Sequence, residues 1–176
     1  PVRFCNSDTG KKVEGPVPVI RAVAGIGQAL GIGRHYHVGT SIPGKKGRIA
    51  YESPAADILY EAHRTLEKHV LSQSQIFMKM HVANEFGRLI HEAYFFDPLI
   101  DDLKAFLESS QSRVSGVCSI SLKPWRIESV SVSTPFDLLQ AGGSVYGEQA
   151  DYYNSRDARG ASRLHSYEQV LIKRSS

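Results

Sequence analysis

Residues 31–54 read GIGRHYHVGTSIPGKKGRIAYESP, and this stretch decides how the rest of the chain is interpreted. Two short runs with β-strand character, residues 34–38 and 48–52, flank a segment rich in Gly, Pro and Lys. Ser53 and Pro54 then suit the N-cap and the first residue of a helix. Because binding groups are often presented on loops held between regular elements, we predict a binding loop over residues 39–47.

Helical periodicity dominates the segments on either side of this stretch. Pro18 suits a first helical position, and Gly31 suits the stop of that first helix. The helix that follows Ser53 is predicted to turn one apolar stripe inward and three charged side chains outward. The inward set is Ile58, Leu59, Ala62 and Leu66, and the outward set is Glu61, Arg64 and Glu67.

Three more helices are predicted further along the chain. Ser72 and Gln75 have the spacing of a capping box, which starts a helix that we expect to run to about Tyr94. Asp97 opens the next helix, and Asn154 or Ser155 caps the last. The helix after Asp97 is expected to place Leu99, Leu103, Phe106 and Leu107 inward, and the last helix to have Ala161, Leu164 and Leu171 on its apolar side.

The hydrophobic period changes from 3.6 to 2 after residue 113. Residues 114–122 and 125–132 alternate apolar and polar side chains around a turn at Lys123 and Pro124, with a slip in phase near Glu128. This pattern predicts an antiparallel hairpin with a bulge. The order of elements indicates an α+β fold, with a small, mostly antiparallel sheet packed with several helices, rather than a doubly wound sheet.

Length and composition limit the class of protein. The chain has 176 residues, which favours a single domain over residues 1–176. Its 41% apolar and 22% charged residues are typical of a soluble globular protein, and no run is long enough to span a membrane. A net charge of +3 is weak for a nucleic-acid binder. Cys5 and Cys118 are interpreted as buried free thiols in the cytoplasm, and a start at Pro1 suggests a piece of a longer chain.

No motif in the chain supports catalysis by itself. His35 and His37 share one side of a predicted strand, which would permit a metal site, but a third ligand at suitable spacing is missing. The predicted loop at residues 39–47 has more groups that could bind a ligand. Its glycines let a ligand approach the backbone, its side chains are basic, and a phenol follows just beyond it. These groups suit an anionic or zwitterionic ligand, although an ordinary exposed basic loop has the same composition; they are Gly39, Gly44, Gly47, Lys45, Lys46, Arg48 and Tyr51.

The sequence also resembles the C-terminal, catalytic and multimerisation domain of argininosuccinate synthase over essentially its whole length. In that family a Gly-x-Gly-Arg run, a strand and a Glu-Asn-Arg triplet precede Gly-x-Lys-x-Arg-x-x-Tyr-Glu-x-Pro and a helix that contains Ala-His. The matching residues here are Gly31, Gly33, Arg34, Gly44, Lys46, Arg48, Tyr51, Glu52, Pro54, Ala62 and His63, and the match continues through Glu67, Ser110, Gln111 and Asp157.

The resemblance implies part of an ATP-dependent ligase that joins citrulline and aspartate to give argininosuccinate, AMP and pyrophosphate. ATP and Mg would be bound mainly by an N-terminal domain that residues 1–176 do not include, so this piece alone is expected to be inactive. The family is cytoplasmic and tetrameric, and its C-terminal helix reaches neighbouring subunits. Neither nucleic acid nor membrane is an expected partner.

Carried over by position, Tyr51 matches the tyrosine that contacts the amino-acid end of citrulline. Lys46 and Arg48 also match, with a role in supporting the loop as the alternative. Gly39, Thr40 and Ser41 stand where the family has Glu-Asn-Arg, and the glutamate of that triplet binds the citrulline ammonium. We therefore expect a divergent, bacterial branch in which Thr40 with backbone carbonyls holds the ammonium, or in which the substrate has changed.

Two other functions stay open on the sequence alone. One is a non-catalytic amino-acid-binding or assembly module derived from the family, which the glycine at position 39 makes conceivable. The other is an unrelated basic protein that binds RNA, for which the chain lacks a platform of aromatic and basic residues.

Overall fold

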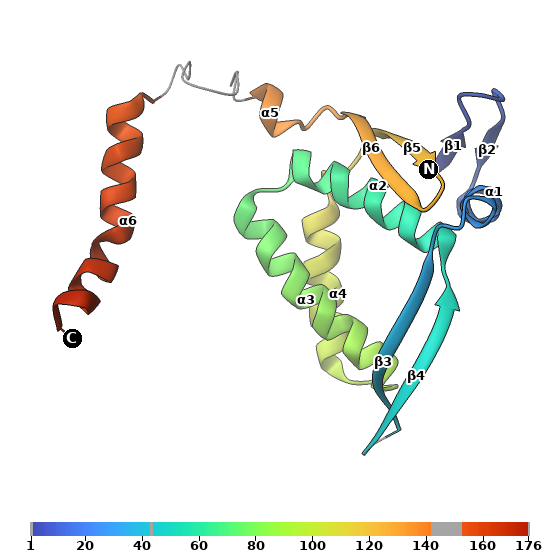
Figure 1. Cartoon of the computed structure of the whole chain (residues 1–176), viewed down its shortest axis with the longest axis horizontal. Helices are drawn as coiled ribbons and strands as arrows, with labels where there is room; N and C mark the ends of the chain where they lie inside the picture. The colour runs from blue at the N-terminus through green and yellow to red at the C-terminus, as the bar shows by residue number, and fades with distance from the viewer. Residues whose placement is uncertain (1, 43, 142–152, 176) are drawn as a thin grey trace. The chain divides into compact units, whose positions relative to one another are not determined.

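A computed structural model describes residues 2–42, 44–141 and 153–175 of the chain (Figure 1). It divides into two compact units, Pro1–Phe136 and Asp137–Ser176. Within the described ranges there are six helices and three two-stranded antiparallel sheets, which confirms the α+β class. None of the described helices is both long enough and apolar enough to cross a membrane.

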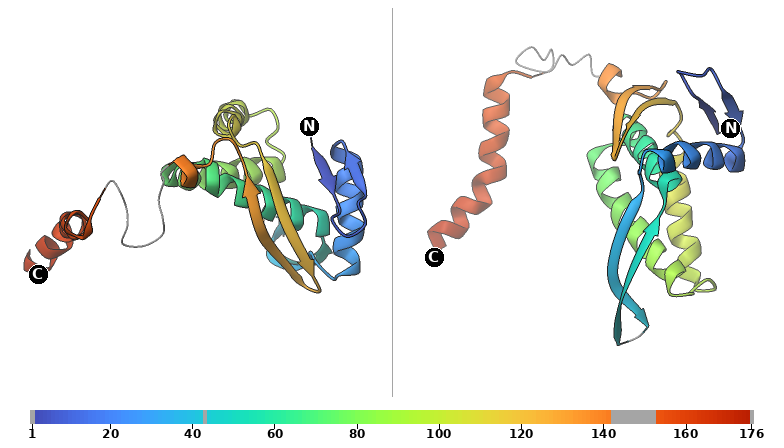
Figure 2. Two further views of the ribbon diagram at one scale, coloured as in Figure 1. Left: turned by 90° about the horizontal axis from the view of Figure 1, so that it is seen from above. Right: turned by 45° about the vertical axis from the view of Figure 1, so that its right-hand side comes forward.

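The first unit contains three β-ribbons and four helices. In chain order its elements are β1 (Arg3–Cys5), β2 (Lys12–Glu14), α1 (Pro16–Ala29), β3 (Arg34–Ile42), β4 (Lys45–Glu52), α2 (Pro54–Val70), α3 (Gln73–His91), α4 (Pro98–Gln111), β5 (Val117–Lys123) and β6 (Arg126–Ser133). Helix α2 packs against α1 and against the β5–β6 ribbon, and α3 packs against α4 (Figure 2). Helix α2 is therefore the central element of this unit.

Two small apolar clusters lie along α2. At its N-terminal end Ile58 packs with Val19 and Val23 of α1, and at its C-terminal end Leu66 packs with Val70 and Leu71. The close crossing of α1 and α2 depends on Gly27, because a methyl group added there would lie 2.8 Å from both Ile58 Cδ1 and Pro54 Cβ. Burial on this scale contributes about 1.5–3 kcal/mol for each fully buried aliphatic side chain.

The base of the β3–β4 hairpin is fixed by glycine geometry and one aromatic ring. Gly33 has a φ of +80°, and a side chain there would come within 2.5 Å of Pro54 Cα. Gly31 lies under the indole of Trp125. The backbone N–H of Trp125 donates to the Leu30 carbonyl at 2.9 Å. The Arg34 guanidinium stacks over the same indole at 4.9 Å. From this base the hairpin extends as a long ribbon (Figures 1 and 2).

The predicted loop over residues 39–47 was wrong in extent. The strands run on to Ile42 and restart at Lys45, with Gly39 paired to Gly47 and Thr40 paired to Lys46. Composition suggested a loop because Gly, Pro and Lys are rare in strands. The segment is nevertheless paired as two strands, because pairing across the hairpin satisfies its backbone N–H and C=O groups.

The start and end residues of the helices followed the sequence signals closely. Helix α1 begins at Pro16, two residues before Pro18, and α3 ends at His91 rather than near Tyr94. The capping box of Ser72 and Gln75 is confirmed. Ser53 takes the N-cap position of α2 but makes no side-chain bond to the backbone; its hydroxyl donates to Asp57 Oδ1 at 3.2 Å instead.

The late hairpin is also confirmed, with its bulge opposite the step from Ser119 to Ile120. That shift leaves Val130 as the extra residue, two positions beyond the predicted slip at Glu128. Cys5 and Cys118 are both free thiols, but the expectation that both are buried was wrong. Cys5 is exposed and Cys118 is half-buried, and that burial raises the pKa of the Cys118 thiol.

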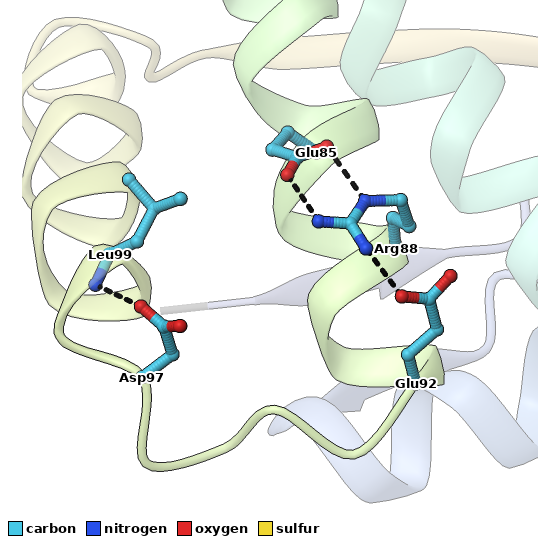
Figure 3. Close-up of polar contacts among 5 residues, drawn as sticks. All are labelled: Glu85, Arg88, Glu92, Asp97 and Leu99. Carbon is cyan, nitrogen blue, oxygen red and sulfur yellow. Dashed lines mark hydrogen bonds and ion pairs between the residues drawn. The ribbon is translucent and has the colours of Figure 1, made fainter.

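Helices α3 and α4 form a pair joined by a short connection. Figure 3 shows Arg88 of α3 between Glu85 of the same helix and Glu92, the residue that follows it, and Asp97 capping α4 through the Leu99 N–H at 2.9 Å. The expectation that α4 turns four apolar side chains inward was only partly right. Leu103 and Leu107 are half-buried, whereas Leu99 and Phe106 remain exposed within the described residues.

The second unit contains α5 (Leu138–Ala141) and α6 (Ser155–Ser175). Asn154 caps α6 through its side-chain oxygen, which accepts the backbone N–H of Arg156 at 2.8 Å, as predicted. No described residue of α6 is buried, and Leu164 and Leu171 on its apolar side are exposed. Gly142 and Gly143, where the sequence predicts a loop, lie outside the described residues.

Candidate functional site

The β3–β4 hairpin has two chemically different faces. Side chains directly opposite one another in an antiparallel pair share a face, and successive residues along a strand alternate. One face carries the pairs His35–Tyr51 and His37–Ile49, followed by Gly39 with Gly47. The other carries Arg34–Glu52, Tyr36–Ala50, Val38–Arg48 and Thr40–Lys46. We call these the histidine face and the basic face.

Tyr51 lies on the histidine face with its phenol open to solvent. Its side chain is 47% exposed, and its ring lies 5.2 Å from the His35 imidazole at a tilt of 32°. His35 is held in turn by Asp57 at the start of α2, with Nε2 at 2.7 and 2.9 Å from the two carboxylate oxygens. Because a carboxylate only accepts, Nε2 is the donor. The Tyr51 ring therefore packs on an imidazole whose orientation is fixed.

The other three predicted site residues lie on the basic face. Thr40, Lys46 and Arg48 are exposed, and the Arg48 guanidinium lies over the Tyr36 ring at 5.7 Å. The structure thus brings Thr40, Lys46 and Arg48 together and places them on the opposite side of the ribbon from Tyr51. A single small ligand on the histidine face would contact Tyr51 without touching those three side chains.

Gly39 leaves space on the histidine face, and His37 fills it. A methyl group added at Gly39 would overlap His37 Nε2 and lie 3.2 and 3.3 Å from the two neighbouring ring carbons. The imidazole therefore occupies the volume that a side chain at position 39 would take. This contact was not predicted from the sequence, because residues 39–47 were expected to form a loop. In a loop, the alternation of side chains along a strand cannot be used to assign residues to one face or the other.

The expected sharing of one side by His35 and His37 is confirmed by the register. Within the described residues no group of three His, Cys, Asp or Glu side chains could hold a metal ion. A hollow of about 500 Å³ lies elsewhere, lined by residues of the β1–β2 turn, α1 and β5, and includes no residue of the hairpin.

A buried carboxylate joins helices α2, α3 and α4. Glu67 of α2 is only 6% exposed, and its Oε1 lies 2.7 Å from Lys79 Nζ of α3, 2.8 Å from Gln111 Nε2 of α4 and 3.2 Å from His63 Nε2. The sequence analysis placed Glu67 on the solvent side of α2, which was wrong. Burial raises its pKa, but hydrogen bonds and charges from His63 and Lys79 outweigh this and lower it to about 2.

These features define an α+β domain whose exposed ribbon carries the Tyr51 phenol and the imidazoles of His35 and His37 on one face. Comparison with known sequences gives the family. The sequence model described as "Arginosuccinate synthase C-terminal domain" matches residues 1–172. The chain belongs to the argininosuccinate synthase family, in the part that forms its C-terminal domain.

Curated relatives agree with this assignment. The chain is 35% identical over 162 residues to "Argininosuccinate synthase" of Xylella fastidiosa (strain Temecula1), covering 92% of the chain and 40% of that relative. It is 38% identical over 141 residues to the protein of the same name from Xanthomonas campestris, covering 80% of the chain and 35% of the relative. The chain thus spans about two fifths or less of the length of these relatives.

Proposed function

We propose that this chain is the C-terminal part of an ATP-dependent ligase that joins citrulline and aspartate to form argininosuccinate, AMP and pyrophosphate, in arginine biosynthesis in the cytoplasm. Family membership over residues 1–172 is the observation that carries the proposal. ATP activates the citrulline ureido oxygen as an adenylate and releases pyrophosphate. The aspartate amine then attacks the ureido carbon, and AMP leaves.

The role of this chain in that reaction is to position citrulline rather than to transfer groups. The Tyr51 hydroxyl contacts the amino-acid end of citrulline, and the packing of its ring on His35 keeps it in place. Positioning of this kind lowers the barrier by fixing the reactants in a productive geometry before reaction. Lys46 and Arg48 support the hairpin on its basic face, with Thr40 beside them. ATP, with Mg, and aspartate are bound by the N-terminal domain of the full-length protein.

Substitution of Tyr51 by Phe tests the binding role. The change removes one hydroxyl and keeps the ring that packs on His35. Loss of one hydrogen bond to a charged group costs about 1.5–3 kcal/mol, so calorimetry on the full-length gene product should show citrulline affinity reduced at least tenfold, with ATP affinity unchanged. Tyr36→Phe on the basic face is the matched control and should bind citrulline normally. Equal citrulline affinity in wild type and Tyr51→Phe would remove Tyr51 from the site.

A second measurement separates the ligase from its alternative. We expect the full-length gene product to form argininosuccinate from citrulline, aspartate and ATP, and the chain of residues 1–176 to form none. The alternative, a non-catalytic amino-acid-binding or assembly module, is favoured by the absence of a side chain at Gly39. It would be supported if the full-length protein bound citrulline but released no pyrophosphate.

A further inference from the structure

We infer that His37 is the group on the hairpin that binds the α-ammonium of the amino-acid ligand, through a ring nitrogen of its neutral imidazole. The inference rests on the proposed function for the identity of the ligand, citrulline. The placement of His37 comes from the geometry of the ribbon alone.

The register places His37 next to Tyr51. Tyr51 is directly opposite His35, so His37 is its diagonal neighbour on the same face. Such diagonal pairs in an antiparallel ribbon are about 7–8 Å apart, which is within reach of aromatic and other long side chains, so both residues can contact one small ligand. Thr40, by contrast, lies on the basic face, where its hydroxyl is on the other side of the ribbon from the Tyr51 phenol.

His37 is exposed, and its ring lies close to the backbone at Gly39. Gly39 provides the space for it, since an added methyl group there would overlap Nε2. Within the described residues, neither ring nitrogen of His37 has a hydrogen-bond or ion-pair partner in the protein. His35 differs in this respect, because its Nε2 is already committed to Asp57.

The chemistry of a neutral imidazole fits an ammonium group. One ring nitrogen of the neutral form is an acceptor, and an ammonium offers three donors. A hydrogen bond to a charged donor is stronger than one between neutral groups. Tyr51 and His37 together therefore form a pair of polar groups, separated along one face, that can hold the charged end of an amino acid.

Calorimetry on the full-length gene product, with citrulline and its des-amino analogue as probes, tests the inference. Wild-type protein should bind citrulline, and His37→Ala should weaken that binding about tenfold. His37→Glu should keep or tighten it, and His37→Lys should weaken it more than His37→Ala does, because a second cation repels the ammonium. The des-amino analogue should bind wild type and His37→Ala equally.

Two further variants guard against a purely structural explanation. Gly39→Ala displaces the imidazole without changing its chemistry and should reproduce the loss seen in His37→Ala. Val38→Ala, on the basic face of the same strand, should bind citrulline like wild type. Unchanged citrulline affinity in His37→Ala, an equal loss for both probes, or tighter binding by His37→Lys would overturn the inference. Failure of the wild-type protein to bind citrulline would instead count against the proposed function.

Discussion

A single carboxylate, Glu67, ties three helices of the first unit together. It belongs to α2 and pairs with Lys79 of α3 and Gln111 of α4. A buried carboxylate is tolerated only when hydrogen bonds and opposite charge replace the water that it has lost. Here they do so well enough that the pKa of Glu67 is about 2, below its ordinary value of 4.5. The ionised form is therefore favoured in the folded state.

This shift predicts an acid-sensitive contribution to stability. A carboxylate with a depressed pKa stabilises the fold above its unfolded pKa of 4.5, and that contribution is lost as the pH falls from 4.5 towards 2. At neutral pH it should amount to roughly 3 kcal/mol. Urea unfolding of the chain at several pH values should show Glu67→Gln less stable at pH 7 by about this amount and less sensitive to acid than wild type.

Glu108→Gln provides the matched control for this prediction. Glu108 is exposed on α4, with Lys104 at 3.9 Å, and exposed pairs of this kind contribute little to stability. We expect its unfolding curve to follow that of wild type at every pH. Parallel pH dependence in wild type and Glu67→Gln would show that the Glu67 cluster is not the source of the acid sensitivity.

At the scale of single residues, the sequence does not by itself show which side chains are buried and which are exposed. Tyr51 is 47% exposed, and its role in binding citrulline stays a prediction. Glu67 was assigned to solvent because a charged residue beside an apolar stripe usually faces water. Its partners Lys79 and Gln111 come from two other helices, and no spacing within α2 indicates them.

At the scale of elements, the hairpin shows where local patterns stop being informative. Periodicity and capping residues placed the helices within a few residues, because those signals lie within each helix. The extent of β3 and β4 depends on pairing between strands, and glycines at positions 39 and 47 concealed it in the sequence. The division of the candidate residues between two faces followed from that pairing and could not be derived before it.

The start of α3 offers a test of a feature that the sequence did predict. Ser72 Oγ accepts the Gln75 N–H at 3.2 Å, and the Gln75 side chain accepts the Ser72 N–H at 3.0 Å. Ser72→Ala removes one of these bonds and should cost about 1 kcal/mol, or about 2–4 °C in Tm. Thermal unfolding followed by circular dichroism would measure this. Ser74→Ala, two residues further along the chain, should leave Tm nearly unchanged. An equal shift in both variants would contradict a capping role for Ser72.

For the whole molecule, the main question is what stabilises α6. Most helical stability in proteins comes from packing an apolar face, and no described residue of α6 is buried in this structure. Leu164 is 80% exposed and Leu171 is 45% exposed. We therefore propose, in line with the tetramer expected from the family resemblance, that the apolar side of α6 packs on another subunit of the full-length protein.

Introducing negative charge on that side should break the assembly. Replacing Leu164 and Leu171 together by Glu puts two carboxylates where an apolar contact is needed, at a cost of several kcal/mol per subunit. Light scattering after size exclusion of the full-length gene product should then give the mass of a smaller species, whereas wild type should give that of a tetramer. Arg159→Ser, on the opposite side of α6, should keep the wild-type mass. If the double variant also kept that mass, α6 would not be the subunit contact, and the exposed leucines would need another partner within the same chain.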